Sequence, residues 1–592
     1  MKIVLAAINA KYIHSNLAVY YLRTYAAIYK EYITIREFTI NNSAEEILKE
    51  LYTEEADVIA FSCYIWNMSM IWELTDVLKK VRPGVKLWLG GPEVTYHSHE
   101  LLRSRKTVDG IVIGEGEQIF LELMGYYVDG TRKLEEISGI VYRDSARLKQ
   151  YGESPKADTA GICCSEAEVL SGRKPLPMDD ILFPYEDLEH LQNRIIYYES
   201  SRGCPYSCSY CLSSADRGVR LRSLTLVKKE LQFFLDRRVT QVKFVDRTFN
   251  CNKQHAIGIW QYIREHDNGI TNFHFEITAD ILTEEELNIL SSLRPGQVQL
   301  EIGVQTTNPD TMGAIRRRVN FQKLSENVER IRAGHNIHQH LDLIAGLPLE
   351  NLSSFKKSFN DVYRLKPDQL QLGFLKLLKG SPMEKDREKY GIVCRETPPY
   401  EVLFTGALSF EELLKLKGIC EMVEVYYNSG QFVSTMEYLE HFFESPVELY
   451  EALSIYYEAK GHRRLAHSRM RRYEILVDFY GDMVVELNPE HDIIPEIKPD
   501  RELFAELLLY DMYLREDLKS RPYFAKAPLG QKRLREIREA YQLGKEPIHV
   551  EQFTYDIRGA AVTGKPVRRD QEIMFRYDRR DPISYSAETT VL

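Results

Sequence analysis

Residues 202–211 read RGCPYSCSYC, and this stretch decides the fold. Its cysteines, Cys204, Cys208 and Cys211, follow the spacing C-x3-C-x2-C directly after a predicted buried strand at 195–201. Three thiolates on one tight loop can hold three corners of a [4Fe–4S] cluster and leave the fourth iron open. A zinc site usually has four nitrogen or sulfur ligands, and no fourth ligand is evident nearby. The pattern therefore favours an iron–sulfur cluster over zinc or three unrelated buried thiols.

Around this loop, apolar runs of strand length alternate with helical patterns. Six strands are expected, at 195–201, 241–246, 273–278, 298–304, 339–345 and 369–375. Strands that alternate with helices indicate parallel β/α units, and six such units predict a partial or full barrel. In barrels of this type the chemistry lies at the carboxyl ends of the strands, which is where the cysteine loop falls.

The amino-terminal part of the chain has its own alternating pattern. Five apolar runs are expected to form strands, at 2–8, 32–40, 57–64, 85–89 and 110–113. With the intervening helices they predict a doubly wound, flavodoxin-like parallel sheet over residues 1–130. Ligands of such sheets bind beyond the carboxyl ends of the strands, and polar and glycine residues gather at these ends here.

The remaining segments are less informative. Residues 131–194 are expected to connect the two α/β domains, and the barrel domain is expected to span 195–385. Residues 386–592 predict a mainly α-helical domain with terminal strands near 549–557 and 573–577. Its basic runs at 460–464 and 469–473 suit either an anionic substrate or RNA, or simply a solvated helix face, which is the simpler interpretation.

Composition excludes several classes of protein. A chain of 592 residues requires three or more domains at about 100–200 residues each. No run of 18 apolar residues occurs, so no membrane span is expected. A net charge of −10 argues against a general nucleic-acid coat. Nine cysteines are too few for a disulfide scaffold, and residues 1–8 read as a strand rather than a signal peptide, so we expect a cytoplasmic protein.

The cysteine loop resembles the signature of the radical S-adenosylmethionine (SAM) superfamily, which also has an aromatic residue before the last cysteine. The resemblance implies that Cys204, Cys208 and Cys211 bind a [4Fe–4S] cluster whose open iron chelates SAM. Reductive cleavage of SAM then yields a 5′-deoxyadenosyl radical that abstracts a substrate hydrogen. By the same resemblance Tyr210 packs near the adenine.

Other predicted strand ends resemble this superfamily in their order along the chain. Glu276 and Gln305 are candidates for polar contacts to SAM, although a strand-end Glu is also commonly a solvated rim residue. Gly346, in the sequence Gly-Leu-Pro, belongs to the cofactor end or only shapes a turn. The Gly-Gly-Glu that often follows the second strand is absent, and Asp246-Arg247 stands there, which leaves the contact to the SAM amino group open.

A doubly wound domain before such a barrel resembles the cobalamin-binding class of the superfamily. His14, Ser62 and the pair Gly90-Gly91 occupy the places of the three cobalamin-binding elements, with the first element degenerate. Glu115 and Gly116 belong to a turn, at 114–117, that resembles a loop recurrent in the class. His14 is either a cobalt ligand or a polar wall residue, because the Asp that would orient its second nitrogen is missing. The domain could also be flavodoxin-like and bind another ligand or none.

The overall layout resembles a bacterial subfamily with a carboxy-terminal domain of unknown function, of the DUF4080 type. It implies a cobalamin-dependent radical SAM enzyme, with methyl transfer from methylcobalamin to an unactivated carbon as the leading activity. The substrate would be a small molecule, peptide or RNA, and an electron donor such as flavodoxin or ferredoxin is expected. Three alternatives remain open: a non-methylating cyclase or rearrangement enzyme, a tRNA methylthiotransferase-like enzyme, and a non-catalytic cobalamin or redox sensor. The methylthiotransferase needs a second cysteine cluster, and the other six cysteines show no such grouping in the amino-terminal domain.

Overall fold

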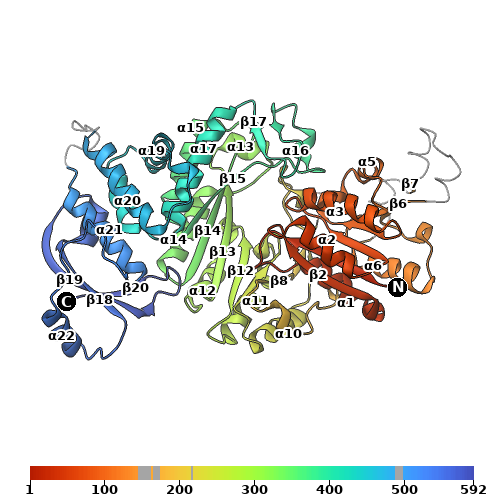
Figure 1. The fold of residues 1–592 in the computed structure, drawn as a ribbon, viewed down its shortest axis with the longest axis horizontal. Coiled ribbons are helices and arrows are strands. Elements are labelled where there is room, and N and C mark those ends of the chain that lie inside the picture. The colour runs from red at the N-terminus through yellow and green to blue at the C-terminus, as the bar shows by residue number, and fades with distance from the viewer. Residues whose placement is uncertain (145–161, 164–173, 215–217, 487–497) are drawn as a thin grey trace. The chain divides into compact units, whose positions relative to one another are not determined.

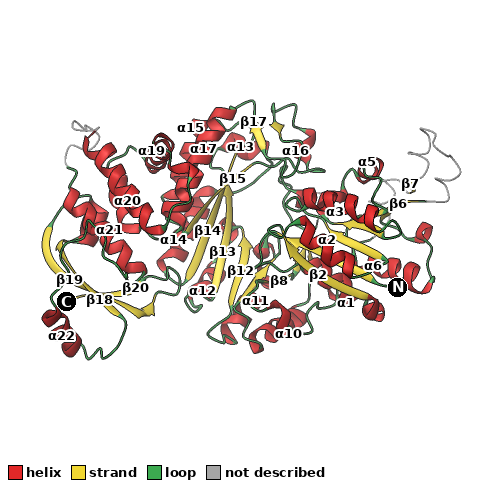
Figure 2. Cartoon of the chain, viewed as in Figure 1, coloured by secondary structure: helices red, strands yellow, loops and turns green. Residues whose placement is uncertain are grey.

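The computed structural model describes residues 1–144, 162–163, 174–214, 218–486 and 498–592. The chain divides into two compact units. Unit 1 comprises residues 1–298, 313–318 and 375–403, and unit 2 comprises residues 299–312, 319–374 and 404–592. Figure 1 traces the chain from end to end, and Figure 2 distinguishes its helices from its strands.

The amino-terminal part of unit 1 is built on a seven-stranded sheet in the order β2-β1-β3-β4-β5-β6-β7. Its first five strands are parallel: β1 (Ile3–Asn9), β2 (Ile33–Thr39), β3 (Val58–Ser62), β4 (Lys86–Gly90) and β5 (Gly110–Val112). Every residue of β1 is buried, as expected for a central strand covered on both faces. The predicted doubly wound sheet is therefore confirmed.

Helices cover both faces of this sheet because the chain reverses its direction across it at β1. The helices are α1 (Leu17–Tyr25), α2 (Ala44–Thr53), α3 (Met68–Val81), α4 (Pro92–Thr95), α5 (Ser98–Ser104) and α6 (Glu117–Met124). Helix α2 packs beside α3, while α1 packs beside α6. Right-handed crossovers place α1 on the face opposite α2 and α3 when the strand order reverses in this way. Figure 1 shows α2 and α3 together over the sheet.

The segment expected to be a connection, 131–194, contributes to the same sheet. Strands β6 (Ile140–Arg143) and β7 (Ile162–Cys163) extend it as antiparallel edge strands. Both are too short to give a clear alternating pattern in the sequence. Residues 145–161 and 164–173 of this segment lie outside the described residues.

The second sheet has six strands in the order β8-β11-β12-β13-β14-β15. They are β8 (Ile196–Tyr198), β11 (Gln241–Phe244), β12 (Asn272–Ile277), β13 (Val298–Gln305), β14 (Ile337–Ala345) and β15 (Gln369–Phe374). The pairs β8–β11, β11–β12 and β14–β15 are parallel. The helices between the strands are α10 (Leu224–Asp236), α11 (Lys253–Glu265), α12 (Glu284–Ser291), α13 (Pro309–Ala314), α14 (Phe321–Ala333) and α15 (Leu352–Tyr363). This is the predicted partial (β/α)6 barrel.

Local signals start these helices at the observed residues. Asn252, Asn320 and Asn351 cap α11, α14 and α15 with their side chains, and Thr283 forms a capping box with Glu286 at α12. Each cap satisfies an amide that would otherwise lack an intrahelical partner.

The carboxy-terminal part of unit 2 is mainly helical, as predicted. Its helices are α17 (Phe410–Val423), α18 (Val433–Glu440), α19 (Pro446–Ala459), α20 (Arg469–Phe479), α21 (Arg501–Arg515), α22 (Gln531–Ala540) and α23 (Ile557–Thr563). An antiparallel sheet in the order β18-β19-β20 ends the chain, with β18 (Ile548–Tyr555), β19 (Arg568–Arg580) and β20 (Ala587–Val591). The strand β20 has no counterpart in the sequence-based prediction.

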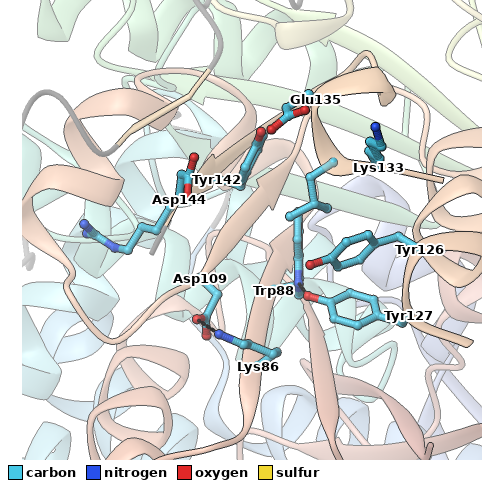
Figure 3. A pocket seen from close by; sticks show the side chains of 11 residues that line it. Lys86, Trp88, Asp109, Tyr126, Tyr127, Lys133, Glu135, Tyr142 and Asp144 are labelled. Carbon is cyan, nitrogen blue, oxygen red and sulfur yellow. Dashed lines mark hydrogen bonds and ion pairs between the residues drawn. The ribbon is translucent and has the colours of Figure 1, made fainter. Parts of the chain in front are cut away.

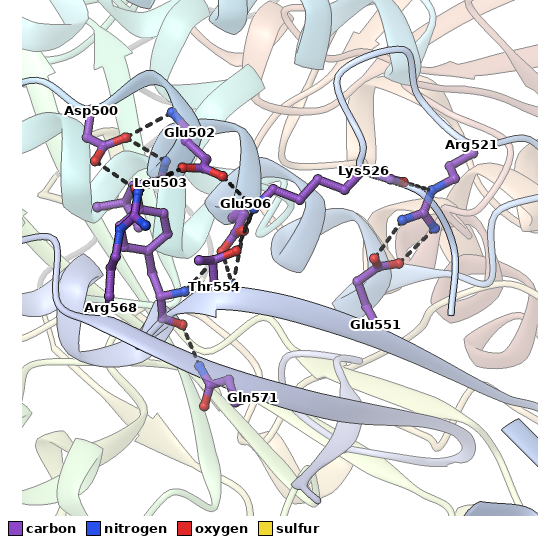
Figure 4. A network of polar contacts seen from close by, with 11 residues as sticks. Asp500, Glu502, Leu503, Glu506, Arg521, Lys526, Glu551, Thr554, Arg568 and Gln571 are labelled. Atoms are coloured by element: carbon purple, nitrogen blue, oxygen red, sulfur yellow. Dashed lines mark hydrogen bonds and ion pairs between the residues drawn. The ribbon is translucent and has the colours of Figure 1, made fainter. Parts of the chain in front are cut away.

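Buried polar contacts join α21 to β18 in this region (Figure 4). The buried carboxylate of Glu506 accepts hydrogen bonds from the amides of Thr554 and Tyr555 and from Lys526 Nζ, at 2.9, 3.2 and 2.7 Å. Arg521 makes a bidentate pair with Glu551, which is 1% exposed. Because each buried charge has partners, the network fixes the sheet on the helices.

None of the helices in the described part of the chain combines the length and the hydrophobicity needed to cross a bilayer.

Candidate active site

The three cysteines lie on the loop that follows β8 and the short strand β9 (Ser201–Arg202) in unit 1. Cys208 is buried, while Cys204 and Cys211 are half-buried, and all three are free thiols. Gly203 begins the loop with φ of +93°, and a Cβ there would stand 1.8 Å from the carbonyl oxygen of Gly218. Only glycine fits this position, so the backbone before Cys204 is set by steric exclusion.

The far end of the loop is fixed by main-chain hydrogen bonds. Ser209 N donates to Ile315 O at 2.9 Å, and Met383 N donates to Ser209 O at 2.8 Å. Both partners are distant in sequence, so the thiols are held on a rigid support. A donor set of one buried and two half-buried thiols on such a loop fits an iron–sulfur cluster with one open corner.

Arg317 lies beside the thiols and was not singled out from the sequence. Its Nη1 atom lies 3.9 Å from Cys208 Sγ. Burial raises the pKa of the Cys208 thiol, and the guanidinium of Arg317 opposes this rise. Burial likewise raises the pKa of Tyr210, which keeps its phenol neutral beside the thiols. The run Arg316-Arg317-Arg318 was the available signal, but charge alone does not reveal which side chain turns inward.

Asp246, which stands where Gly-Gly-Glu is common, serves the structure of the loop. Its two carboxylate oxygens accept hydrogen bonds from Ser200 N at 3.0 Å and from the hydroxyls of Ser200 and Ser201 at 2.6 Å. His255 Nε2 lies 3.0 Å from the same Ser200 hydroxyl. Asp246 is 1% exposed, so it anchors the turn before the cysteine loop from the protein interior.

The predicted SAM contacts fall on the expected strand ends. Glu276 is half-buried near the end of β12 in unit 1. In unit 2, Gln305 ends β13 with φ of +74°, and Gly346 follows β14 with φ of +84°. A positive φ at Gln305 costs of order 1–3 kcal/mol, and such strain gathers at binding sites. Its buried Oε1 atom has no hydrogen-bond partner among the described residues, which suits contact with a ligand.

The predicted cobalamin residues meet at the carboxyl edge of the first sheet. Ser62 on β3 is paired in register with Gly90 on β4, and Ser62 Oγ lies 3.3 Å from Asn16 Nδ2. Gly91 has φ of +123°, and a Cβ there would stand 2.5 Å from Cys63 O. Gly116 precedes α6, where a Cβ would stand 3.0 Å from Leu22 Cδ2. Packing within the domain therefore requires glycine at position 91 and leaves little room for a side chain at position 116.

His14 is tied to the barrel by hydrogen bonds. Its Nδ1 atom lies 2.6 Å from the hydroxyl of Tyr197 on β8, and Ile195 N donates to Ile13 O at 2.7 Å. Burial lowers the pKa of His14, and Lys11 and Lys243 lower it further. If His14 is a cobalt ligand, the contact through Nδ1 leaves Nε2 as the ligating nitrogen. If it is a polar wall residue, the hydrogen bond to Tyr197 is sufficient to explain a histidine at this position.

Aromatic side chains at the same edge were not singled out from the sequence. Tyr64 and Trp66 stack with centroids 4.4 Å apart and ring planes 7° apart, and Trp66 Nε1 donates to Ile8 O at 3.1 Å. Trp66 is 43% exposed and Tyr12 is 63% exposed. Exposed, anchored rings beside glycine backbone suit a large flat ligand such as a corrin.

Glu115 lies in an ion-pair network that links this domain to the cysteine loop. It pairs with Arg202, at 3.5 Å, and with Arg220. Arg202 also contacts Glu117 at 2.5 Å and Glu199 at 2.9 Å. Burial raises the pKa of Glu199 to about 7, against the opposing effect of Arg202. Glu115, which the sequence suggested as a cofactor-binding residue, thus forms ion pairs with two arginines of the chain itself.

A cavity of about 340 Å³ lies elsewhere in the first domain (Figure 3). Lys86, Asp109, Trp88 and Tyr127 are among the residues that line it. Lys86 begins β4 and Asp109 precedes β5, so the cavity opens at the edge opposite Ser62 and Gly90. None of the predicted site residues lines this cavity. The predicted cobalamin residues Ser62 and Gly90 lie at the other edge of the sheet.

Three family models match the chain in the predicted order. The B12 binding domain covers residues 3–124, the radical SAM superfamily covers 198–362, and a protein of unknown function, DUF4080, covers 388–575. The chain is therefore a B12-binding radical SAM protein. It carries the DUF4080 domain at the carboxyl end of the matched region, as the sequence predicted.

Several curated relatives are methyltransferases. The chain is 24% identical over 468 residues to 2-(S-pantetheinyl)-carbapenam-3-carboxylate methyltransferase from Streptantibioticus cattleyicolor, covering 72% of this chain and 65% of the relative. It is also 24% identical to the cobalamin-dependent radical SAM methyltransferase TokK from Streptomyces tokunonensis, covering 57% of this chain and 50% of the relative. The chain thus spans half to about two thirds of the length of these relatives.

The solved structures support the fold. The cobalamin-dependent SAM radical enzyme OxsB, with aqua-cobalamin and SAM bound, superposes with a TM-score of 0.55 at 15% identity. The match covers 91% of this chain and 81% of OxsB.

Proposed function

We propose that this protein is a cobalamin-dependent radical SAM methyltransferase that methylates an unactivated carbon. The observation that carries the proposal is the rigid loop with Cys204, Cys208 and Cys211, in a chain that also matches the B12 binding domain. Relatives that are named methyltransferases support methylation.

One set of residues would bind the cluster and SAM, and another set would bind cobalamin. When bound, the [4Fe–4S] cluster with SAM supplies the hydrogen-abstracting radical, and cobalamin supplies the methyl group. Cys204, Cys208 and Cys211 would hold the cluster, with Arg317 placing positive charge beside Cys208. Gln305 would bind SAM through its buried amide oxygen.

The cobalamin residues would act through shape and hydrogen bonding. Ser62 would donate a hydrogen bond to the nucleotide tail, and Gly90 and Gly91 would allow the corrin to approach the backbone. The exposed ring of Trp66 would cover an apolar face of the corrin and exclude water from it.

The partners and compartment follow from the cofactors. A [4Fe–4S] centre consumes one electron for each SAM that it cleaves, so we infer a low-potential donor of the flavodoxin or ferredoxin class. The eight cysteines in the described part of the chain are all free thiols, which supports a reducing compartment such as the cytoplasm.

The decisive test uses anaerobically reconstituted, full-length protein with cobalamin, SAM and a reductant. We expect the visible absorbance of an iron–sulfur cluster and the release of 5′-deoxyadenosine. Both should be lost in the triple variant Cys204→Ala, Cys208→Ala, Cys211→Ala. Cys420→Ala is the matched control, since Cys420 lies on α17 and contacts Leu372 O. Cleavage of SAM by the triple variant contradicts the assignment, and the absence of cleavage in the unmodified protein favours a cobalamin sensor.

The product separates methylation from rearrangement. Mass spectrometry of metabolites, peptides and RNA from a deletion strain should reveal a species that lacks one CH2 unit relative to the parent strain. A substrate of the same mass as its product instead indicates a rearrangement, and one heavier than its product by two hydrogens indicates an oxidative cyclase.

A further inference from the structure

Strands β13 and β14, both in unit 2 apart from the first residue of β13, present a set of ligating side chains on one face. In β13 the buried residues alternate with half-buried ones, and Glu301 belongs to the half-buried set. In β14 the sequence His338-Gln339-His340-Leu341-Asp342 places two histidines and an aspartate at every second position. Since side chains alternate across a strand, these three share one face.

Three of these side chains converge. One ligating atom each from Glu301, His340 and Asp342 lie within 4.8 Å of one another. His340 Nε2 is 3.1 Å from Asp342 Oδ1, and these side chains are 8% and 19% exposed. The donors of an ion with bonds of about 2.1 Å lie up to about 4.2 Å apart, so small side-chain movements would complete a coordination sphere.

The charges of these side chains suit a divalent ion. Two carboxylates crowded in a largely buried place repel each other, and burial makes the repulsion stronger than in water. A divalent cation with a neutral imidazole matches the charge of the two carboxylates and is ligated by all three side chains.

A second observation points to the same face. The Nδ1 atom of His338 is buried and has no hydrogen-bond partner among the described residues. A buried imidazole nitrogen of this kind is rare without a ligand, water or ion. It stands two residues before His340 on the same strand, where it extends the row of donors.

We propose that Glu301, His340 and Asp342 form a binding site for a divalent first-row metal ion such as Mn²⁺, Fe²⁺ or Zn²⁺. Imidazole with carboxylates is a donor set that suits these ions, and a site with three protein ligands keeps coordination positions open for water or an oxygen atom of a substrate. All three ligating residues belong to unit 2, and the inference does not depend on the proposed function.

Mn²⁺ is the probe of choice because thiolates bind it poorly. The full-length chain is prepared metal-free with Cys204, Cys208 and Cys211 all changed to Ala, so that cluster thiols do not compete. Titration with Mn²⁺, followed by the electron paramagnetic resonance signal of the free ion, should show one ion bound per chain. Asp342→Asn and Glu301→Gln should each weaken binding by at least about tenfold.

The control is Glu329→Gln, which removes an exposed carboxylate of α14 in the same unit and should leave binding unchanged. Mn²⁺ should also raise the thermal midpoint of the parent protein but not that of the site variants. If Asp342→Asn fails to fold, the nearly isosteric Glu301→Gln decides the question. Absent binding in the parent, or equal binding in the site variants, overturns the proposal. Because no SAM chemistry is measured, this failure is distinct from a failure of the proposed function.

Discussion

Single buried residues behind the cysteine loop form hydrogen bonds that their positions in the sequence do not reveal. Asp246, Ser200 and His255 form a buried chain of hydrogen bonds in which His255 is 4% exposed. A buried carboxylate is stable only when its oxygens accept hydrogen bonds, and Ser200 and Ser201 supply them here. The turn that leads to Cys204 therefore depends on an imidazole that remains neutral.

Acid should weaken this arrangement through His255. Burial lowers its pKa from 6.5 to about 4, so the unfolded chain binds this proton more readily than the folded chain. The contribution of His255 to stability is complete above pH of about 6.5 and is lost as the pH falls from there toward about 4. The thermal midpoint of the unmodified protein should therefore drop more between pH 8 and pH 5 than that of His255→Gln.

The exposed His266 provides the control for this comparison. His266→Gln should retain the pH dependence of the unmodified protein, since this side chain lies at the exposed end of α11. Parallel curves for the unmodified protein and His255→Gln would show that another group governs acid sensitivity.

At the scale of elements, the turn between β4 and α4 shows how a strand end becomes a binding edge. The adjacent glycines Gly90 and Gly91 differ in what a side chain would meet. A Cβ at Gly90 would make an ordinary contact of 3.7 Å with Val112 Cβ, whereas one at Gly91 would overlap Cys63 O at 2.5 Å. Only Gly91 has a positive φ, so the close approach of two strand ends depends on that residue.

This difference predicts unequal effects of the two alanine substitutions. Gly91→Ala should cost more than about 1 kcal/mol of unfolding free energy, because it combines a positive φ with overlap against backbone. Gly90→Ala should fold normally and alter only the affinity for cobalamin. Denaturant unfolding measures the first effect and equilibrium dialysis with cobalamin the second. Equal stability of the two variants would contradict the steric argument.

At the scale of the molecule, Arg202 connects two domains within unit 1. It belongs to the cysteine loop region, yet it contacts Glu117 at the start of α6 in the B12-binding domain. Arg202 is 14% exposed and Glu117 is 5% exposed, so neither charge can recover solvation if the other is removed. The pair therefore couples the position of the first domain to the loop that carries the thiols.

Removal of this cation should be costly. Arg202→Met leaves buried carboxylates without a partner and should destabilise the protein by roughly 3–5 kcal/mol. Adding Glu117→Gln to that variant should recover part of the loss, which a double-mutant cycle would measure. Arg220→Met, at the more exposed pair with Glu115, should cost less. Additive effects of Arg202→Met and Glu117→Gln would refute the coupling.

The sequence by itself determined the two parallel α/β domains, the helical carboxy-terminal region and the cysteine loop. Strand and helix periodicity are local properties, and C-x3-C-x2-C places its ligands within eight residues. The sequence also placed Ser62, Gly90, Gln305 and Gly346 at strand ends, since strand ends can be read from where apolar runs stop.

Only the tertiary structure decided which distant side chains meet. Arg317 beside Cys208, Tyr197 beside His14, and Glu301 beside His340 each join residues that are 39 or more positions apart in the chain. Such contacts depend on strand order and on which face a side chain takes, and neither is encoded in a local pattern. For the same reason the partners of Glu115 and the anchoring role of Asp246 emerged only once the chain was folded.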